Sequence, residues 1–320
     1  MKPRIKLRRL IERYVAYRQA LGEKFLTNRN ILRAFGRSVG ATVAVAAVGL
    51  PETTRFLYGH GPVTSAWHIK HAALKGFFRY ALGRDHIAKI PLPEVLPERP
   101  PPFVAYLYTR EEVRRLLAAT DGYQRNRSCL EPVTMRVLIL LLYATGLRVH
   151  EAIALNRDQV DLDQSLLTVV RTKFYKSRLV PFTPQLSRVL RAYLARPTSA
   201  AVGPSPEAPF FTTTRRGARI NQCTVEGAFR RACEHAGIRR NDGARYQPRL
   251  HDLRHTFAVT RLTTWYRRGH DVQRLLPHLA VYLGHVYLAA TQVYLHMTPE
   301  LLQQANRRFQ RYANPRTNHA

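Results

Sequence analysis

Six prolines stand within the short stretch "IPLPEVLPERPPPF" at positions 90–103. Proline lacks a backbone N–H donor and disfavours the helical conformation in the residue before it, so neither a helix nor an inner strand can run through this stretch. It is therefore predicted to be an extended linker at residues 91–104. The linker divides the 320-residue chain into residues 1–90 and 105–320, and each part is long enough for a core of its own.

Helical periodicity dominates both parts. Apolar side chains recur on one face over residues 5–20, 27–39 and 64–82 in the first part, and Thr64 or Ser65 is suited to cap the last of these helices. In the second part, Thr109 precedes a helix, residues 135–146 read as a buried helix that ends at Gly146, and residues 165–182 read as a β-hairpin. Further helices are expected around 222–236, 250–264, 271–282 and 290–312. The expected fold class is mainly α with a small antiparallel β-sheet.

The charge of the chain points to a polyanion. It carries 51 Lys and Arg against 21 Asp and Glu, a formal net charge of +30. Residues 1–100 hold 18 of the basic and 6 of the acidic side chains, so both parts are basic and the excess is not confined to a tail. This pattern favours a nucleic-acid-binding protein whose two domains both face the polyanion. Composition alone does not separate DNA from RNA, and an Arg-rich proteome or an RNA-bound structural protein also fits it.

Cysteine content and hydropathy indicate the compartment. The three cysteines, Cys129, Cys223 and Cys233, form no C-x-x-C pair, which favours reduced thiols and disfavours both a disulfide framework and a structural zinc site. The basic start shows no signal-peptide pattern, and the longest apolar run, at 41–50, is too short to cross a bilayer. A cytoplasmic protein with no membrane partner is expected.

Four stretches supply groups suited to one reaction. "ATGLRVHEAIAL" places Arg148 at a helix start, and "RTKFYKSRLVPF" places Lys173 and Lys176 on a hairpin turn. "RLHDLRHTFAVT" puts His251 and Arg254 three residues apart, on one helical face. "LGHVYLAATQVYLHM" contains His285, Tyr287 and Tyr294, and periodicity does not tell a core tyrosine from a nucleophile.

Cleavage of a phosphodiester by tyrosine requires what these stretches contain. The attacking phenol must lose its proton, and the leaving 5′ oxygen needs a proton that Lys or His can donate. The charge that develops on the non-bridging oxygens is matched by bidentate guanidinium groups. A metal would call for clustered carboxylates, and only Glu151 and Asp252 lie within these stretches. The set predicts phosphoryl transfer without a metal or other cofactor.

The four stretches, in this order, resemble the motif boxes of the tyrosine recombinases of the phage-integrase and Xer type. The resemblance covers the second part of the chain nearly end to end, and residues 1–90 are similar in size to the family's core-binding domain. It implies a catalytic domain with the DNA breaking-rejoining fold. The length between the second and third boxes, with "TPELLQQA" after Tyr294, is similar to recombinases borne by mobile elements.

The resemblance assigns the catalytic residues one by one. Matching each box to the family gives Arg148, Lys173, His251, Arg254, His285 and the nucleophile Tyr294. Tyr294 stands nine residues after His285, the usual spacing in the family, and Tyr287 does not. The turn lacks the glycines common in the family, so Lys176 competes with Lys173 for the role of general acid.

Other residues are expected to position these groups or to bind DNA. Glu151, Asp252 and His255 are expected to orient the catalytic side chains. His251 and His255 also have a zinc-compatible spacing, but no third ligand stands out. The basic residues expected to contact DNA phosphates are Arg4, Lys6, Arg8, Arg9, Lys70, Lys75, Lys176 and Arg178.

The implied activity is site-specific recombination of double-stranded DNA. By resemblance, the strands are cleaved and rejoined through a 3′-phosphotyrosyl intermediate that needs neither metal nor ATP. Four protomers would synapse two sites, and the tail at 301–320 would dock on a neighbouring protomer. Two alternatives stay open: a strand transferase like the type IB topoisomerases, and a DNA-binding protein without activity. The target sequence, and whether the task is integration, excision or resolution, is not encoded in these motifs.

Overall fold

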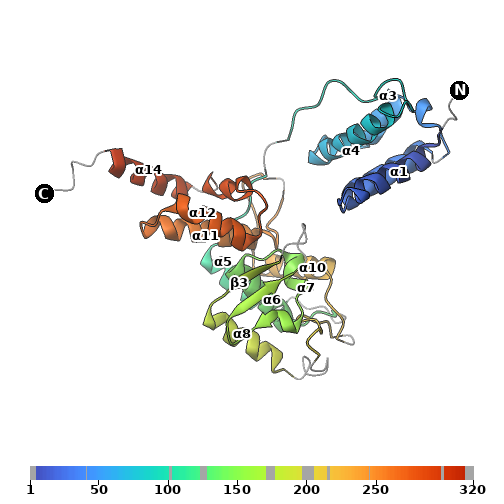
Figure 1. Cartoon of the computed structure of the whole chain (residues 1–320). Coiled ribbons are helices and arrows are strands. Elements are labelled where there is room, and N and C mark those ends of the chain that lie inside the picture. Colours follow the sequence, from blue (N-terminus) through green and yellow to red (C-terminus); the bar gives the residue numbers. More distant parts are fainter. Residues whose placement is uncertain are drawn as a thin grey trace. The chain divides into compact units, whose positions relative to one another are not determined.

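The computed structural model divides the chain into two compact units, Met1–Phe103 (unit 1) and Val104–Ala320 (unit 2). It describes residues 5–40, 42–100, 103–122, 128–170, 177–196, 205–214, 217–244, 246–296 and 299–313 (Figure 1). The division falls at the end of the predicted proline linker. The separate functions assigned to the two parts stay predictions.

The described residues of unit 1 form four α-helices and one 3-10 turn. These are α1 (Leu7–Ala20), α2 (Leu26–Val39), η1 (Val45–Ala47), α3 (Leu50–Tyr58) and α4 (Ser65–Leu82). The predicted face of α1 is buried, and Thr64 caps α4 by accepting a hydrogen bond from the Ala66 N–H. Helix α3, which begins at the end of the apolar run at 41–50, was not predicted from the sequence. Its start is fixed by Pro51 in the first turn and by Glu52, whose carboxylate accepts from the Gly49 N–H.

The first residues of the predicted linker belong to the core of unit 1. The Thr53 hydroxyl donates a hydrogen bond of 2.6 Å to the Pro91 carbonyl, and Ile90 and Leu92 pack against the buried cluster. Within the predicted extended linker at 91–104, the first residues are therefore packed against unit 1, and the linker bounds stay a prediction. Apolar side chains between the prolines supply this packing, and proline spacing alone does not reveal it.

Unit 2 is mostly helical around a small sheet, which confirms the predicted fold class. Its helices are α5 (Arg110–Ala119), α6 (Pro132–Thr145), α7 (Val149–Ala154), α8 (Pro184–Leu194), α10 (Gln222–His235), α11 (Asp252–Arg267), α12 (Val272–Leu283), α13 (Ala289–Gln292) and α14 (Pro299–Ala313), with 3-10 turns η2 (Arg157–Gln159) and η3 (Val293–His296). Strands β1 (Val160–Asp161), β2 (Leu166–Val169) and β3 (Arg178–Pro181) form one antiparallel sheet in the order β1-β2-β3.

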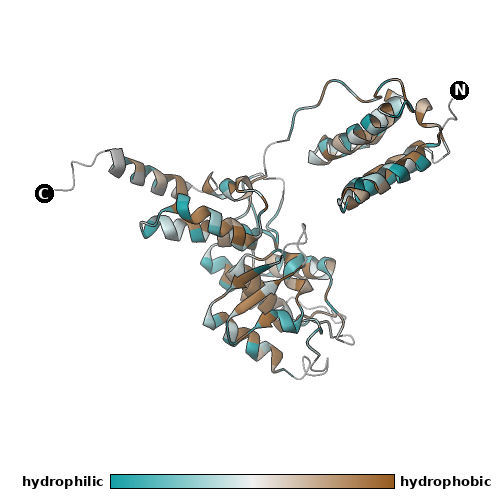
Figure 2. Cartoon of the chain, viewed as in Figure 1, coloured by the Kyte–Doolittle hydropathy of each residue, from teal (hydrophilic) through white to brown (hydrophobic). Residues whose placement is uncertain are grey.

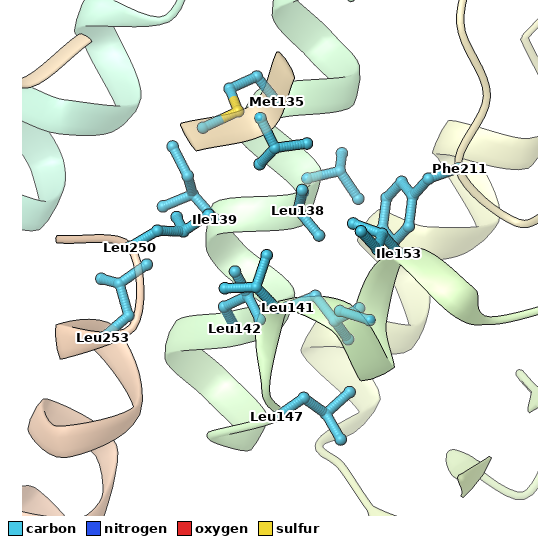
Figure 3. Packing of buried hydrophobic residues seen from close by; sticks show 14 of the residues in the cluster. Met135, Leu138, Ile139, Leu141, Leu142, Leu147, Ile153, Phe211, Leu250 and Leu253 are labelled. Atoms are coloured by element: carbon cyan, nitrogen blue, oxygen red, sulfur yellow. The ribbon is translucent and has the colours of Figure 1, made fainter. Parts of the chain in front are cut away.

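Helix α6 forms the centre of the unit 2 core. Its side chains are buried on nearly every side, and Figure 3 shows Leu138, Leu141 and Leu142 among residues from other elements. In Figure 2 the ribbon of α6 is largely brown, whereas α1 mixes teal and brown residues. Helix α6 ends at Gly146 in the left-handed conformation, and a Cβ there would lie 2.5 Å from the Phe257 ring. The end of α6 at Gly146 is as predicted, and the glycine also lets α6 end against α11.

The predicted hairpin is present. Leu167 pairs with Val180 and Val169 with Arg178, so the two strands run antiparallel into the turn. The turn itself, with Lys173 and Lys176, lies outside the described residues.

The prediction of one helix over 290–312 is wrong. The chain instead forms α13, the 3-10 turn η3 and the separate helix α14. Pro299 is the first residue of α14, and proline both suits that position and disfavours helix in the residue before it. Helix α8, which follows its cap Thr183 directly after β3, was also missed.

In the part of the chain that the structure describes, no helix is long and apolar enough to cross a bilayer.

Candidate active site

Three arginines meet at the end of α12. The carboxyl-terminal carbonyls of a helix have no partner within it and carry its negative dipole end, so they attract guanidinium groups. Three successive carbonyls are used in this way: Arg178 Nε donates to Tyr282 (2.8 Å), Arg254 Nη2 to Leu283 (2.7 Å) and Arg148 Nη2 to Gly284 (3.1 Å). The end of α12 therefore fixes arginines from α7, β3 and α11 in one place.

Gly284 is required for this convergence. It has φ 69°, in the left-handed region, and a Cβ on it would lie 2.7 Å from Arg178 Nη1. Only glycine lets the chain turn at the end of α12 while a guanidinium lies against its backbone.

Glu151 joins two of the arginines. Its carboxylate accepts from Arg178 Nη1 and Nη2 at 3.0 and 2.8 Å and from Arg148 Nη1 at 2.9 Å, and it also accepts from the Arg148 N–H. Burial acts to raise the pKa of Glu151, but the hydrogen bonds and charge of Arg178, together with Arg148, outweigh it and lower the pKa to about 2. A permanently charged Glu151 holds Arg148 at the N-cap of α7, which is the contact that its predicted orienting role requires.

Arg254 is almost completely enclosed, at 2% exposure. Its Nη1 donates to the Gly146 carbonyl at 2.8 Å, so this side chain joins the end of α6 to the end of α12. Burial and the charge of Arg148 lower its pKa to about 10, which leaves it positive at neutral pH. Two cations, Arg148 and Arg254, are thus held side by side at one helix end.

His285 and Tyr294 lie beside Arg254. His285 Nε2 is 2.9 Å from Arg254 Nη2, and its Nδ1 is 2.7 Å from Thr291 Oγ1. The Tyr294 ring stacks near His285 with centroids 6.1 Å apart and lies 5.5 Å from the His255 ring. Tyr294 is only 3% exposed, whereas Tyr287 is 73% exposed. The structure therefore brings Tyr294 into the arginine site and leaves Tyr287 at the surface.

His251 and His255 complete the histidine cluster. Their rings meet edge to face at 5.1 Å. Burial, with the charges of neighbouring groups including Arg254, lowers the pKa of each to about 4, so both are neutral at neutral pH. Over the described ranges, no three His, Cys, Asp or Glu side chains gather as a metal site would need.

Asp252 is the first residue of α11. Its carboxylate accepts from the Arg249 N–H at 2.8 Å and from Arg249 Nη2 at 3.0 Å. These bonds fix the start of α11 and orient Arg249, and an orienting role toward a catalytic side chain stays a prediction.

The predicted DNA-binding residues occupy different environments. Lys6, Arg8, Arg9 and Lys75 are exposed in unit 1, and Arg4 lies outside the described residues. Lys70 is half-buried, and its amine donates to the Phe56 carbonyl. The Arg178 side chain is 8% exposed and bound to Glu151, so the structure places it within the arginine site and not on an open face.

A cleft of about 890 Å³ opens beside Arg148 and His251. Its wall includes four further arginines, Arg230, Arg239, Arg240 and Arg249. The motifs did not single out these residues, although the doublets "RR" at 230–231 and 239–240 were a visible signal. Thr291 was also missed, because a threonine on an expected helix carries no sign of the ring that it contacts.

Sequence comparison places residues 107–300 in the family described as "Phage integrase family". The chain is 35% identical to the "Putative integrase/recombinase y4rB" of Sinorhizobium fredii over 97% of this chain and 99% of that protein. It is 30% identical to the "Tyrosine recombinase XerC" of Chlamydia caviae over 73% of this chain and 68% of that protein.

Solved structures share the fold. The Tn1549 transposon integrase in complex with transposon right end DNA matches with a TM-score of 0.68 and 16% identity, over 97% of this chain and all of that one. A lambda integrase tetramer bound to a Holliday junction matches with a TM-score of 0.65 and 16% identity, over 92% of this chain and 78% of that one.

Proposed function

The chain belongs to the phage integrase family, whose members are tyrosine recombinases, and from that premise we propose that it cleaves and rejoins double-stranded DNA through a 3′-phosphotyrosyl intermediate formed on Tyr294. The observation that supports this most is the convergence of Arg148, Arg254 and His285 beside the Tyr294 ring. Guanidinium groups that are fixed in advance stabilise the charge that develops on phosphate oxygens.

The reaction uses residues of this chain alone. The Tyr294 oxygen attacks the scissile phosphorus and forms the Tyr–phosphorus bond as the bond to the 5′ oxygen breaks. His251, neutral because of its lowered pKa, accepts the phenolic proton. Lys173 donates a proton to the leaving 5′ oxygen. Attack by the 5′ hydroxyl of another strand reverses the step and frees Tyr294. The phosphotyrosyl bond retains the energy of the broken bond, so no ATP is consumed, and the guanidinium groups take the charge-stabilising role that a metal ion would have.

The wider assembly extends the same proposal. The shallow hollow of about 650 Å³ at the start of α1 is lined by one acidic side chain, Glu12, and by the basic side chains Lys6, Arg8, Arg9 and Arg13. Its basic excess is suited to DNA phosphates, as is the arginine-lined cleft of unit 2. A tetramer on two synapsed sites fits the tetrameric lambda integrase complex of the same fold. In the same proposal, the tail at 301–320 docks on a neighbouring protomer. A mobile-element origin fits the transposon integrase of the same fold.

Covalent trapping tests the proposal. On a nicked suicide duplex in excess EDTA, the unmodified chain is expected to form an adduct that survives SDS. Tyr294→Phe should form none while binding the duplex normally, because the ring remains and only the attacking oxygen is removed. Tyr287→Phe is the matched control and should react like the unmodified chain.

Two outcomes would reject the assignment. An adduct on Tyr294→Phe that is absent from Tyr287→Phe would move the nucleophile. Cleavage that stops in EDTA and returns with Mg²⁺ would replace the mechanism with a metal-dependent one.

A change of leaving group distinguishes Lys173 from Lys176 as the general acid. A 5′-bridging phosphorothioate leaves as a thiolate that needs no proton, so it should restore cleavage by Lys173→Ala. It should restore little of the cleavage by Arg148→Ala, which lacks charge stabilisation. If the sulfur substrate rescues Lys176→Ala and not Lys173→Ala, the general acid is Lys176.

A further inference from the structure

The His285 ring has a partner at each nitrogen. Its Nε2 lies 2.9 Å from Arg254 Nη2, and its Nδ1 lies 2.7 Å from the hydroxyl oxygen of Thr291. Thr291 is fully buried, and its own N–H is bonded to the Leu288 carbonyl in the turn that follows His285. The ring is therefore held between a guanidinium from α11 and a hydroxyl from α13.

The chemistry of the two partners decides which nitrogen carries the proton. A guanidinium group donates hydrogen bonds and accepts none, so Nε2 must present its lone pair to Arg254. A neutral imidazole then carries its proton on Nδ1, and the Thr291 oxygen must accept it. The ring is neutral at neutral pH, because burial and the charges of Arg254, Arg148 and Arg178 lower the pKa of His285 to about 3.

We infer that Thr291 is a positioning residue that, together with Arg254, holds His285 in the Nδ1-protonated tautomer. In this state Nε2 accepts from Arg254 and helps to fix that guanidinium. The opposite tautomer would place an N–H of the ring against an N–H of Arg254. Without the hydroxyl, the Nδ1–H would be buried with no partner, so neither tautomer would be well satisfied.

The hydroxyl has a second property that matters once a phosphate enters. A threonine hydroxyl can accept from an Nδ1–H or donate to an unprotonated Nδ1. When a phosphate oxygen takes the hydrogen bond of Arg254, the ring can therefore move its proton to Nε2 and donate to that oxygen as well. This second step, the proton shift on phosphate binding, rests on the proposed function. The first step, the Nδ1-protonated tautomer of the free protein, does not.

The first step, the Nδ1-protonated tautomer of His285, can be tested in the free protein. In the full-length chain with ¹⁵N-labelled histidine, protonated and unprotonated ring nitrogens resonate far apart, and a His285→Asn spectrum identifies the His285 signals. The unmodified chain and Thr291→Ser should show one tautomer, with the proton on Nδ1. Thr291→Val should lose this single tautomer and show averaged or displaced nitrogen signals of His285. A proton on Nε2 in the unmodified chain, or unchanged His285 signals in Thr291→Val, would overturn the inference.

Cleavage of the suicide duplex tests the second step. Thr291→Val should cleave about tenfold to a hundredfold more slowly, the cost that is typical of removing a hydrogen-bond partner from a metal-bound histidine. Thr291→Ser, which restores the hydroxyl, should cleave at close to the original rate. Thr134→Val is the matched control, because it removes a buried hydroxyl that bonds Tyr193 at the distant start of α6. Undiminished cleavage by Thr291→Val would contradict the second step.

The two failures can be told apart. If the unmodified chain forms no covalent DNA product, the proposed function fails, and the tautomer measured without DNA still decides the first step. If the adduct forms but the ring proton lies on Nε2, the function stands and the role of Thr291 is wrong.

Discussion

Both units are rich in arginine, but they use it differently. In unit 1, Arg8 and Arg9 are exposed on α1, where their charges face solvent. In unit 2, Arg254 is 2% exposed and the Arg178 side chain 8%, and their donors are taken up by backbone carbonyls and by Glu151. A formal charge count treats these residues alike. The structure separates arginines available to a distant polyanion from arginines built into one site.

The physical cost of the two arrangements also differs. An exposed arginine keeps its hydration and contributes little to folding. A buried one must have its donors satisfied, because an unpaired buried charge is strongly destabilising. The arginine site of unit 2 should therefore be sensitive to the removal of any one partner, and the basic face of unit 1 should tolerate substitution. Each unit has one tryptophan, Trp67 and Trp265, so single-tryptophan variants of the full chain report on each unit separately.

The largest effect on stability is expected from Glu151→Ala. It leaves Arg178 buried without its carboxylate partner, and breaking a buried pair in this way costs about 3–5 kcal/mol. Urea denaturation followed by Trp265 fluorescence measures the decrease in stability. Asp163→Ala, which removes the exposed partner of Arg191 in the same unit, is the control and should change stability by no more than about 0.5 kcal/mol. Equal effects from the two substitutions would show that the arginine site is not a buried network.

Acid should unfold unit 2 before unit 1. The folded pKa of His251 and His255 is about 4 and that of His285 about 3, below the ordinary 6.5, so the unfolded state binds more protons between these values. Stability that is present above about pH 6.5 is lost as the pH falls toward 4. In unit 1, burial lowers the pKa of His71, one histidine against the three of the unit 2 site. The Trp265 signal should therefore change at higher pH than the Trp67 signal. Coincident transitions, or an earlier change of Trp67, would contradict this.

The smallest effect on stability is expected at the basic face of unit 1. In the double variant Arg8→Gln, Arg9→Gln, each substitution should change the free energy of unfolding by no more than about 0.5 kcal/mol, because both side chains are exposed. Duplex affinity should nevertheless become less dependent on salt, by about one unit of slope for each arginine that no longer neutralises a DNA phosphate. An unchanged salt slope would remove α1 from the proposed DNA-binding surface.

Much of the fold could be read from local patterns. The starts of α4 and α5 follow from Thr64 and Thr109, and the end of α6 follows from Gly146, because capping depends on neighbours in the chain. The helices α3 and α8 were missed because they begin within apolar or strand-like surroundings. The break before α14 was missed although Pro299 marks it.

By itself, the sequence predicted the two-part division, through its prolines, and implied a catalytic set, through the resemblance of its four boxes to those of the tyrosine recombinases. Only the tertiary structure decided which partner each of these residues meets. Arg178 reads as a surface cation and contacts the Tyr282 carbonyl 104 residues away, and Arg254 contacts the Gly146 carbonyl across 108 residues. Thr291 gains its role from the Arg254 guanidinium on the other side of the His285 ring. The spacing of residues along the chain specifies neighbours within one helical turn or along one strand. These contacts instead depend on how the ends of α6 and α12 pack against α11, and no local sequence pattern specifies that packing.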